Sequence, residues 1–349
     1  MPTPIDVSPG LTAQAHDDPT DADPGASGAL LFARVLDGKG GGRPIAWADA
    51  PGWTPGAKGE VLWLHLDRTN PDTAAFLRGG LGLPEVTVEA LTSNETRPRV
   101  YLEGGGLVTI LRGVNMNPGA QPEDMIAMQI WADAGRVVSL RRRRLQSPRD
   151  VLGMLDAGRG PATSGDLVTE LIEQMVAKMS PTIVDINELI DDLEDMESGR
   201  DSRATLAEIA KIRRYCLALK RYMTPQHDAL LQLLKTPPAW MTDANRRDVH
   251  ETVEKLRRYL DDLDVSKESA LVLQDDLNNR AADQTNRTMY MLSLVAAIFL
   301  PLGFLTGLLG VNVGGIPGAN ASDGFWVTVA LLAAVFVAQL LIFRKLKWF

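Results

Sequence analysis

The sequence predicts an α+β domain, followed by long stalk helices and two C-terminal transmembrane helices. Three observations support this fold class. Short apolar runs separated by Gly and Pro fill residues 29–160. A long stretch with few helix breakers follows them. Near the C-terminus, residues 289–309 and 325–343 contain no charged side chain.

The N-terminal part combines a polar tail with a small α/β domain. Residues 1–28 are polar and acidic without apolar periodicity, so we expect a disordered tail rather than a signal peptide. Residues 126–130 alternate apolar and less apolar side chains, as a half-buried strand does. Helices are expected at Asp72–Arg78 and Glu85–Leu91. Strands are expected at Leu30–Leu36, Val61–Leu66, Leu107–Val114, Met125–Ala132 and Arg136–Leu140.

Helices dominate the rest of the chain. Ser164 is placed to cap a helix that runs to Ser198 and ends at Gly199. A second helix is expected from Ser202 to Lys235, which makes 161–242 a helical hairpin in the cytoplasm. A third helix, 243–310, meets no breaker before Pro301 and extends over roughly 100 Å. Such a long helix needs other helices against its apolar faces, and other copies of the chain can supply them.

The two charge-free runs are long enough to cross a bilayer. At 1.5 Å per residue they extend over about 31 and 28 Å, close to the hydrocarbon thickness of about 30 Å. A buried hairpin of a soluble protein rarely needs two such runs. Lys and Arg flank the outer ends of the pair, including the tail 344–349, and are absent from the loop 311–324. We therefore expect both termini in the cytoplasm and the short loop outside.

Composition argues against several other classes of protein. A net charge of −8 disfavours nucleic acid as a partner. Cys216 is the only cysteine, so neither a disulfide framework nor a Cys-rich zinc cage is expected. The four histidines are far apart in the sequence. No triad, phosphate-binding loop or catalytic carboxylate pair indicates an enzyme, and no permanently bound cofactor is expected.

One face of the third helix carries the functional hypothesis. Within the membrane it bears small or partly polar residues, whereas the opposite face is bulky and apolar. This face is either a close-packing seam between helices or the wall of a pore. Three acids continue it into the cytoplasm and favour a cation pathway, because like charges in register would repel across a packing seam. The proposed pore-lining residues are Asn286, Met289, Ser293, Ala296, Leu300, Gly303 and Gly307, and the acids are Asp261, Glu268 and Asp275.

The loop after this helix begins with Gly310, Val311 and Asn312. Glycine ends the helix, and a ring of Asn312 amides from several chains would offer neutral oxygens to the water shell of a divalent ion. A plain helix cap is the simpler alternative. We expect Asn312, through hydrating water, and Asp275 to contact the metal. Because two membrane helices cannot enclose a conduit, several copies around a symmetry axis are required.

These motifs resemble the CorA family of divalent-cation transporters. The resemblance rests on Phe299–Phe304 (FLPLGF), on Thr306-Gly307, on Gly310-Val311-Asn312 with its Gly-Gly-Ile-Pro-Gly continuation, and on the C-terminal Lys-Trp-Phe. Val311 and the continuation are similar to the zinc-transport (ZntB-like) branch. The segments 95–99, 111–115, 130–133 and 140–144 match that branch as well, so the resemblance covers about 29–349.

The resemblance implies a homopentameric funnel in the inner membrane, with the first membrane helix around the pore and the second outside it. It implies Zn²⁺ as the transported ion, whereas most of the family has Met at the position of Val311. A Mg²⁺ or Co²⁺ channel is the alternative within the family, and a membrane-anchored cytoplasmic sensor is the alternative from another class.

Two charge clusters are left open. The arginines 141–144 either meet acidic surface on a neighbouring subunit or line the funnel. An acidic run at the tip of the helical hairpin is either a solvated face or an attractor of cations near the cytoplasmic entrance. The run comprises Asp185, Glu188, Asp191, Asp192, Glu194, Asp195 and Glu197.

Overall fold

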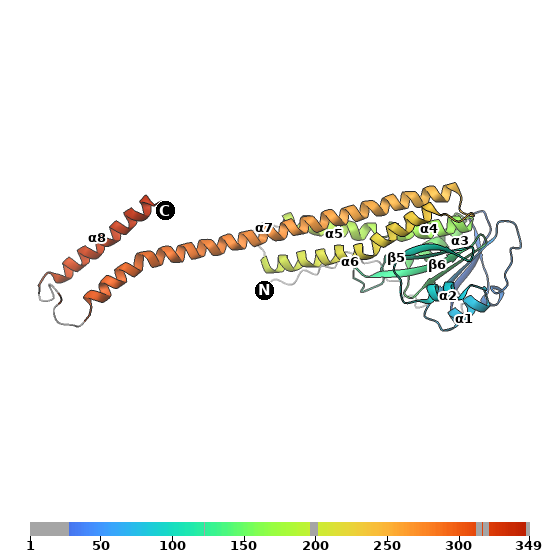
Figure 1. Cartoon of the computed structure of the whole chain (residues 1–349), viewed down its shortest axis with the longest axis horizontal. Coiled ribbons are helices and arrows are strands. Elements are labelled where there is room, and N and C mark those ends of the chain that lie inside the picture. The colour runs from blue at the N-terminus through green and yellow to red at the C-terminus, as the bar shows by residue number, and fades with distance from the viewer. Residues whose placement is uncertain (1–27, 122, 196–201, 312–315, 317–320, 347–349) are drawn as a thin grey trace. The chain divides into compact units, whose positions relative to one another are not determined.

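The computed structural model of the chain describes residues 28–121, 123–195, 202–311, 316 and 321–346. It divides into two compact units, with the boundary between Leu273 and Gln274. Figure 1 labels the helices and strands in chain order. The expected disordered tail and the expected helix end at Gly199 lie outside the described residues.

The first unit contains a seven-stranded sheet in the order β2-β1-β3-β7-β6-β5-β4. Only β3 and β7 pair in parallel; the other neighbours are antiparallel. All the strands expected from apolar runs are present, whereas β2 and β4 were not anticipated from the sequence. The strands are β1 (Leu30–Leu36), β2 (Gly42–Pro44), β3 (Val61–Asp67), β4 (Arg99–Glu103), β5 (Gly106–Val114), β6 (Met125–Ala132) and β7 (Arg136–Arg141).

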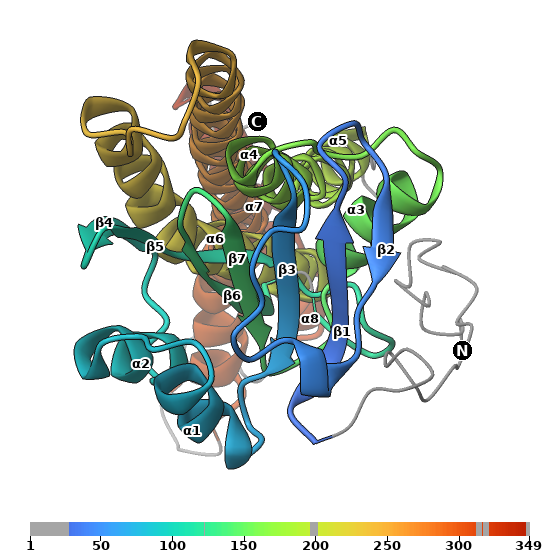
Figure 2. The ribbon, with the colours of Figure 1, turned by 90° about the vertical axis from the view of Figure 1, so that its right-hand side faces the viewer.

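Helices cover both faces of this sheet (Figure 2). On one face, α1 (Asp72–Gly79) and α2 (Glu85–Thr92) pack their apolar residues on β3, β7 and β5. On the other face lie α3 (Gln146–Asp156), which was not expected, and α4 (Ser164–Ala177). The prediction of a half-buried strand at 126–130 is therefore wrong. Gln129 is as completely buried as Ile130, because a helical layer lies on each side.

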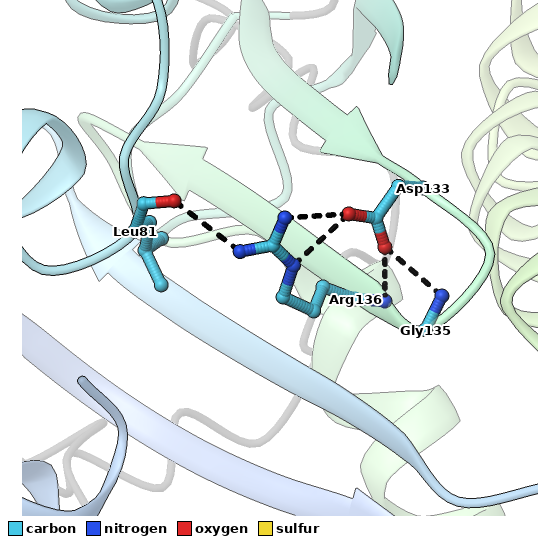
Figure 3. A network of polar contacts seen from close by, with 4 residues as sticks. All are labelled: Leu81, Asp133, Gly135 and Arg136. Atoms are coloured by element: carbon cyan, nitrogen blue, oxygen red, sulfur yellow. Dashed lines mark hydrogen bonds and ion pairs between the residues drawn. The ribbon is translucent and has the colours of Figure 1, made fainter. Parts of the chain in front are cut away.

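The turn between β6 and β7 is fixed by a compact polar network (Figure 3). Asp133 Oδ1 accepts hydrogen bonds from the backbone N–H groups of Gly135 and Arg136 at 2.9 and 2.7 Å. The guanidinium of Arg136 returns two hydrogen bonds to Asp133 Oδ2, donates a third to the carbonyl of Leu81, and lies 5.1 Å from the ring of Trp131. This network ties the hairpin to the loop after α1.

The helix expected from 164 to 198 is divided in two. Its N-cap is Thr163 rather than Ser164, because Thr163 and Asp166 form a reciprocal capping box. The first helix ends at Ala177, and α5 (Ser180–Asp195) begins after a turn at residues 178–179. Pro181 accounts for the break, since it has no N–H to continue the hydrogen-bond ladder but fits the first turn of a new helix.

The remaining helices are α6 (Ser202–Lys235), α7 (Asp243–Leu309) and α8 (Gly324–Lys345). At 67 residues, α7 is continuous through Pro301, as the sequence indicated. A short 3₁₀ turn, η1 (Trp47–Asp49), completes the secondary structure of the described residues. These elements confirm the predicted fold class.

Within the first unit, polar contacts join the start of α7 to the neighbouring helices. Asn245 is almost fully buried, and its Oδ1 accepts hydrogen bonds from both the N–H and the hydroxyl of Thr242. Its Nδ2 donates to Asp166 Oδ1 at 2.7 Å, which joins the N-termini of α4 and α7. Further along, Lys220 of α6 pairs with Asp264 of α7 at 2.5 Å. The part of α7 that belongs to the first unit is thus positioned by α4 and α6.

Candidate cation pathway

The second unit contains α8 and the C-terminal part of α7, whose apolar surfaces are not covered by the residues that the structure describes. Both α8 and the C-terminal part of α7 are long and apolar enough to span a membrane, and none of either apolar segment is buried. Phe299, Leu300 and Phe304 are all more than three-fifths exposed. Such continuous apolar surface requires lipid or other protein chains.

The two faces of α7 differ in this segment. Among the bulky residues, Leu294, Ile298, Leu302 and Leu305 are half-buried, whereas Phe299, Phe304 and Leu308 are exposed. Along the predicted pore-lining face only Ala296 is half-buried, and the others are exposed: Asn286, Met289, Ser293, Leu300, Gly303 and Gly307. The small-residue face is therefore open in the single chain.

Gly303 and Gly307 are not explained by packing inside the chain. A Cβ built at either glycine meets no atom within 4 Å outside its own neighbouring backbone. Their lack of a side chain therefore serves no contact within the described structure. It fits either a second copy packed closely against α7 or a bore that has to stay open.

The Gly310-Val311-Asn312 motif begins where α7 ends. The N–H of Gly310 donates to the carbonyl of Thr306 at 2.9 Å, and the hydroxyl of Thr306 donates to the carbonyl of Gly303 at 3.0 Å. A Cβ on Gly310 would lie 3.0 Å from the Thr306 carbonyl oxygen, so the helix end favours glycine. Val311 is exposed, and Asn312 lies outside the described residues.

The three predicted pathway acids are all exposed on α7. Asp261 and Glu268 lie in the first unit and Asp275 in the second. Leu256, Leu263 and Ala270 of α7 are buried and also repeat every seven residues. They lie about 200° around the helix axis from the three acids. The acids thus lie on the side of α7 away from its own helical bundle. Asp261 has one partner, Arg257, at 4.0 Å.

Two exposed valines share the face of α7 that carries the three acids, here called the acidic stripe, and the sequence analysis did not identify them. Val265 and Val272 are 66% and 63% exposed, and each follows an acid of the stripe by four residues. The signal was present in the spacing, which alternates steps of four and three residues through Asp261, Val265, Glu268, Val272 and Asp275. The stripe therefore alternates carboxylates with apolar side chains.

No metal site is assembled within one chain in the described ranges. There, no group of three or more His, Cys, Asp or Glu side chains is placed to hold an ion. His65 is buried in the sheet, where it stacks on Phe32 and its Nδ1 lies 2.8 Å from Ser139 Oγ. Burial, with the nearby charge of Arg141, lowers the pKa of His65 well below its usual value. His65 is thus a neutral core residue.

The arginine cluster at the end of β7 borders a pocket of about 380 Å³. Arg143 and Arg144 line it together with the 115–120 turn and Asp124. Asn117 braces the turn, because its Nδ2 donates to the carbonyl of Arg144 at 3.0 Å. The pocket is open and carries both signs of charge.

Other segments that carried the family resemblance prove to be scaffold. Arg112 of β5 donates to the carbonyls of Thr96 and Met125 and lies 4.1 Å over the ring of Tyr222. Its backbone N–H donates to Gln226 Oε1 at 2.7 Å. The segments 95–99 and 111–115 therefore meet each other and α6 through one arginine.

Comparison with known proteins identifies relatives across most of the chain. Residues 58–345 match the family described as CorA-like Mg²⁺ transporter protein. The divalent cation transporter CmaX of Pseudomonas aeruginosa is 39% identical over 327 residues, covering 91% of this chain and 96% of that protein. The zinc transport protein ZntB of Yersinia enterocolitica is 37% identical over 320 residues, covering 91% and 95%.

Solved structures agree with these sequence relatives. The structure of full-length CmaX has a TM-score of 0.81 at 37% identity, covering 93% of this chain and all of that one. The CorA magnesium transporter from Methanocaldococcus jannaschii has a TM-score of 0.77 at 16% identity, covering 91% and 99%. The second likeness is one of fold alone.

Proposed function

Because this chain belongs to the CorA-like Mg²⁺ transporter family, we propose that it carries divalent metal ions, chiefly Zn²⁺, across the inner membrane through a homopentameric pore. In this proposal α7 surrounds the axis, α8 faces lipid, and both termini are cytoplasmic. The protein is a transporter of divalent cations and not an enzyme, and the metal is its cargo.

One observation carries the pore assignment. From Asp261 to Gly307 one face of α7 is exposed except at the half-buried Ala296, with small residues in the membrane segment and acids in the cytoplasmic segment. Repeated around a symmetry axis, this face would give a narrow bore that is continuous with rings of carboxylates. Such rings attract cations and repel anions.

Zinc as the main cargo is supported by the relatives named zinc transport proteins, which match over nine-tenths of this chain. The family description, which prints Mg²⁺, supports a magnesium channel as the alternative. A cobalt channel remains the other alternative within the family. Both cargoes are compatible with Asn312 acting through the water shell of the ion, since a neutral amide oxygen hydrogen-bonds to any hydrated cation.

Metal uptake into proteoliposomes tests the proposal. Zn²⁺, Co²⁺ and Mg²⁺ are supplied separately, and subunit number is measured by mass in detergent. We expect Zn²⁺ to enter fastest and the mass to equal five chains. A monomer or dimer would refute the pore, and Mg²⁺ or Co²⁺ entering faster than Zn²⁺ would refute the cargo.

Asn312→Ala tests the outer mouth, with Asn320→Ala in the same loop as its control. Removing the amide ring takes away several ion-hydrating groups at once, so we expect flux at low metal concentration to fall while mass is unchanged. Equal flux in the two variants would exclude a selectivity role for Asn312.

A further inference from the structure

The outer face of α5 is acidic. Glu188, Asp191 and Asp192 are exposed, and none of them forms an ion pair with another residue that the structure describes. They share a stripe with Val184, which is 47% exposed. The opposite stripe of α5 is buried, at Ile183, Ile186, Ile190 and Leu193.

The outer face of α6 has the opposite charge. Arg214 and Arg221 are exposed and flank Leu217, which is 58% exposed. Neither arginine forms an ion pair in the described part of the chain, and the guanidinium of Arg221 lies 5.6 Å from the ring centre of Tyr222. The inner stripe of α6 is buried, at Ile209, Ile212, Cys216, Leu219 and Met223.

The two outer faces are matched in length. Val184 to Asp191 and Arg214 to Arg221 each cover eight residues, or about 10 Å of helix from the first residue to the last. Helices α5 and α6 contact each other, and the outer face of each lies opposite its buried stripe. Neither the acidic face nor the basic face is covered by another part of the chain that the structure describes, so both are accessible to a second copy.

We propose that the acidic face of α5 in one copy docks on the basic face of α6 in the next copy. The charges are complementary, and each face has an exposed apolar side chain among them, Val184 on α5 and Leu217 on α6. Because the two faces differ, the contact is head-to-tail, and a head-to-tail contact forms a ring when its rotation closes. This inference rests on the proposed function, which requires a ring, and it names the cytoplasmic surfaces that join its members.

Cysteine cross-linking in the full-length protein tests the contact. Val184→Cys and Leu217→Cys are combined in a Cys216→Ala background and oxidised in membranes. We expect a ladder of covalent oligomers on denaturing gels, whereas each single variant gives none. The control pairs Leu217→Cys with Val86→Cys, a similarly exposed valine on α2 (60%), and should give no ladder. Absence of the ladder in the test pair overturns the inference.

Charge reversal tests the electrostatic part. In the cross-linking background, Arg214→Glu with Arg221→Glu should slow ladder formation about fivefold, as expected for two surface ion pairs. Glu188→Arg with Asp191→Arg should do the same, and combining all four changes should restore the rate. Arg246→Glu with Arg247→Glu changes the net charge equally on α7 and should have no effect. If the variant with all four charge reversals forms the ladder more slowly than either double variant, the two faces do not contact each other.

Mass and metal uptake measured on the same preparations separate the two hypotheses. A ring that transports metal but gives no ladder refutes only the α5–α6 contact. A monomer that transports no metal refutes the proposed function, and the docking inference falls with it.

Discussion

Replacing the membrane glycines of α7 distinguishes a pore wall from a packing seam. The changes are Gly303→Ala and Gly307→Ala, each introducing one methyl group. Within the chain a Cβ at either position meets no atom within 4 Å, so no clash opposes the change. Alanine in a helix interior is favoured over glycine by up to about 1 kcal/mol. A pore wall therefore predicts a ring that is equally or more stable.

A packing seam predicts the opposite sign. Added methyl groups in a well-packed contact cost about 1–3 kcal/mol, which outweighs the gain in helix propensity. The measurement is the temperature at which the detergent-solubilised oligomer loses subunits. A clear fall in that temperature for Gly303→Ala would refute the pore-wall assignment.

Larger side chains at the same positions test the flux. Gly303→Leu should leave subunit number unchanged but reduce metal uptake strongly, because a ring of leucines narrows and dries the bore. Val329→Leu, at an exposed position on α8, is the control and should transport normally. Normal uptake by Gly303→Leu would mean that ions pass elsewhere.

Further predictions concern the first unit. Asn245→Ala should lower the free energy of unfolding by about 2–3 kcal/mol through lost hydrogen bonds, seen as a fall of about 5–10 °C in the unfolding temperature. Asn245→Asp should lower the stability further at pH 7, because its carboxylate faces that of Asp166. This extra loss of stability should disappear in acid. Lys220→Met should lower the free energy of unfolding by less than about 1 kcal/mol. The hydrogen bond from Lys220 lowers the pKa of Asp264 in the folded protein. The difference in stability between the two proteins should therefore be present above pH about 4 and vanish as the pH falls through the folded-state pKa of Asp264. Cys216, whose pKa burial raises to about 11, should react with maleimide only after unfolding. A rate unchanged on unfolding would contradict that burial.

Much of the architecture was predictable because it depends on local properties. The two charge-free runs appear as the apolar segments of α7 and α8. The absence of breakers between 243 and Pro301 predicted the single long helix, and apolar runs located the longer strands. The family motif at 299–312 pointed to divalent-cation transport before any contact was known.

Of the candidate site, the pathway acids and small residues could be found from helical spacing, since a straight helix maps sequence intervals directly onto faces. Their assignment to a cation pathway is still a prediction. Val265 and Val272 belong to the same stripe but were overlooked, because valine on a long helix looks like a core residue until its burial is known. Their exposure depends on where α4, α5 and α6 pack.

The sequence by itself determined the longer strands, the helices α1, α2, α6 and α7 and the candidate membrane spans, because hydrophobic periodicity, charge-free length and proline are local quantities. It did not indicate β2, β4 or α3. Only the tertiary structure decided the strand order, the complete burial of Gln129 and the capping of α4 by Thr163. It also decided that the charged side chains of α5 and α6 are exposed, on the sides of these helices opposite their buried stripes. The physical reason is the same in each case: burial and pairing are set by residues distant in the chain, which local patterns do not encode.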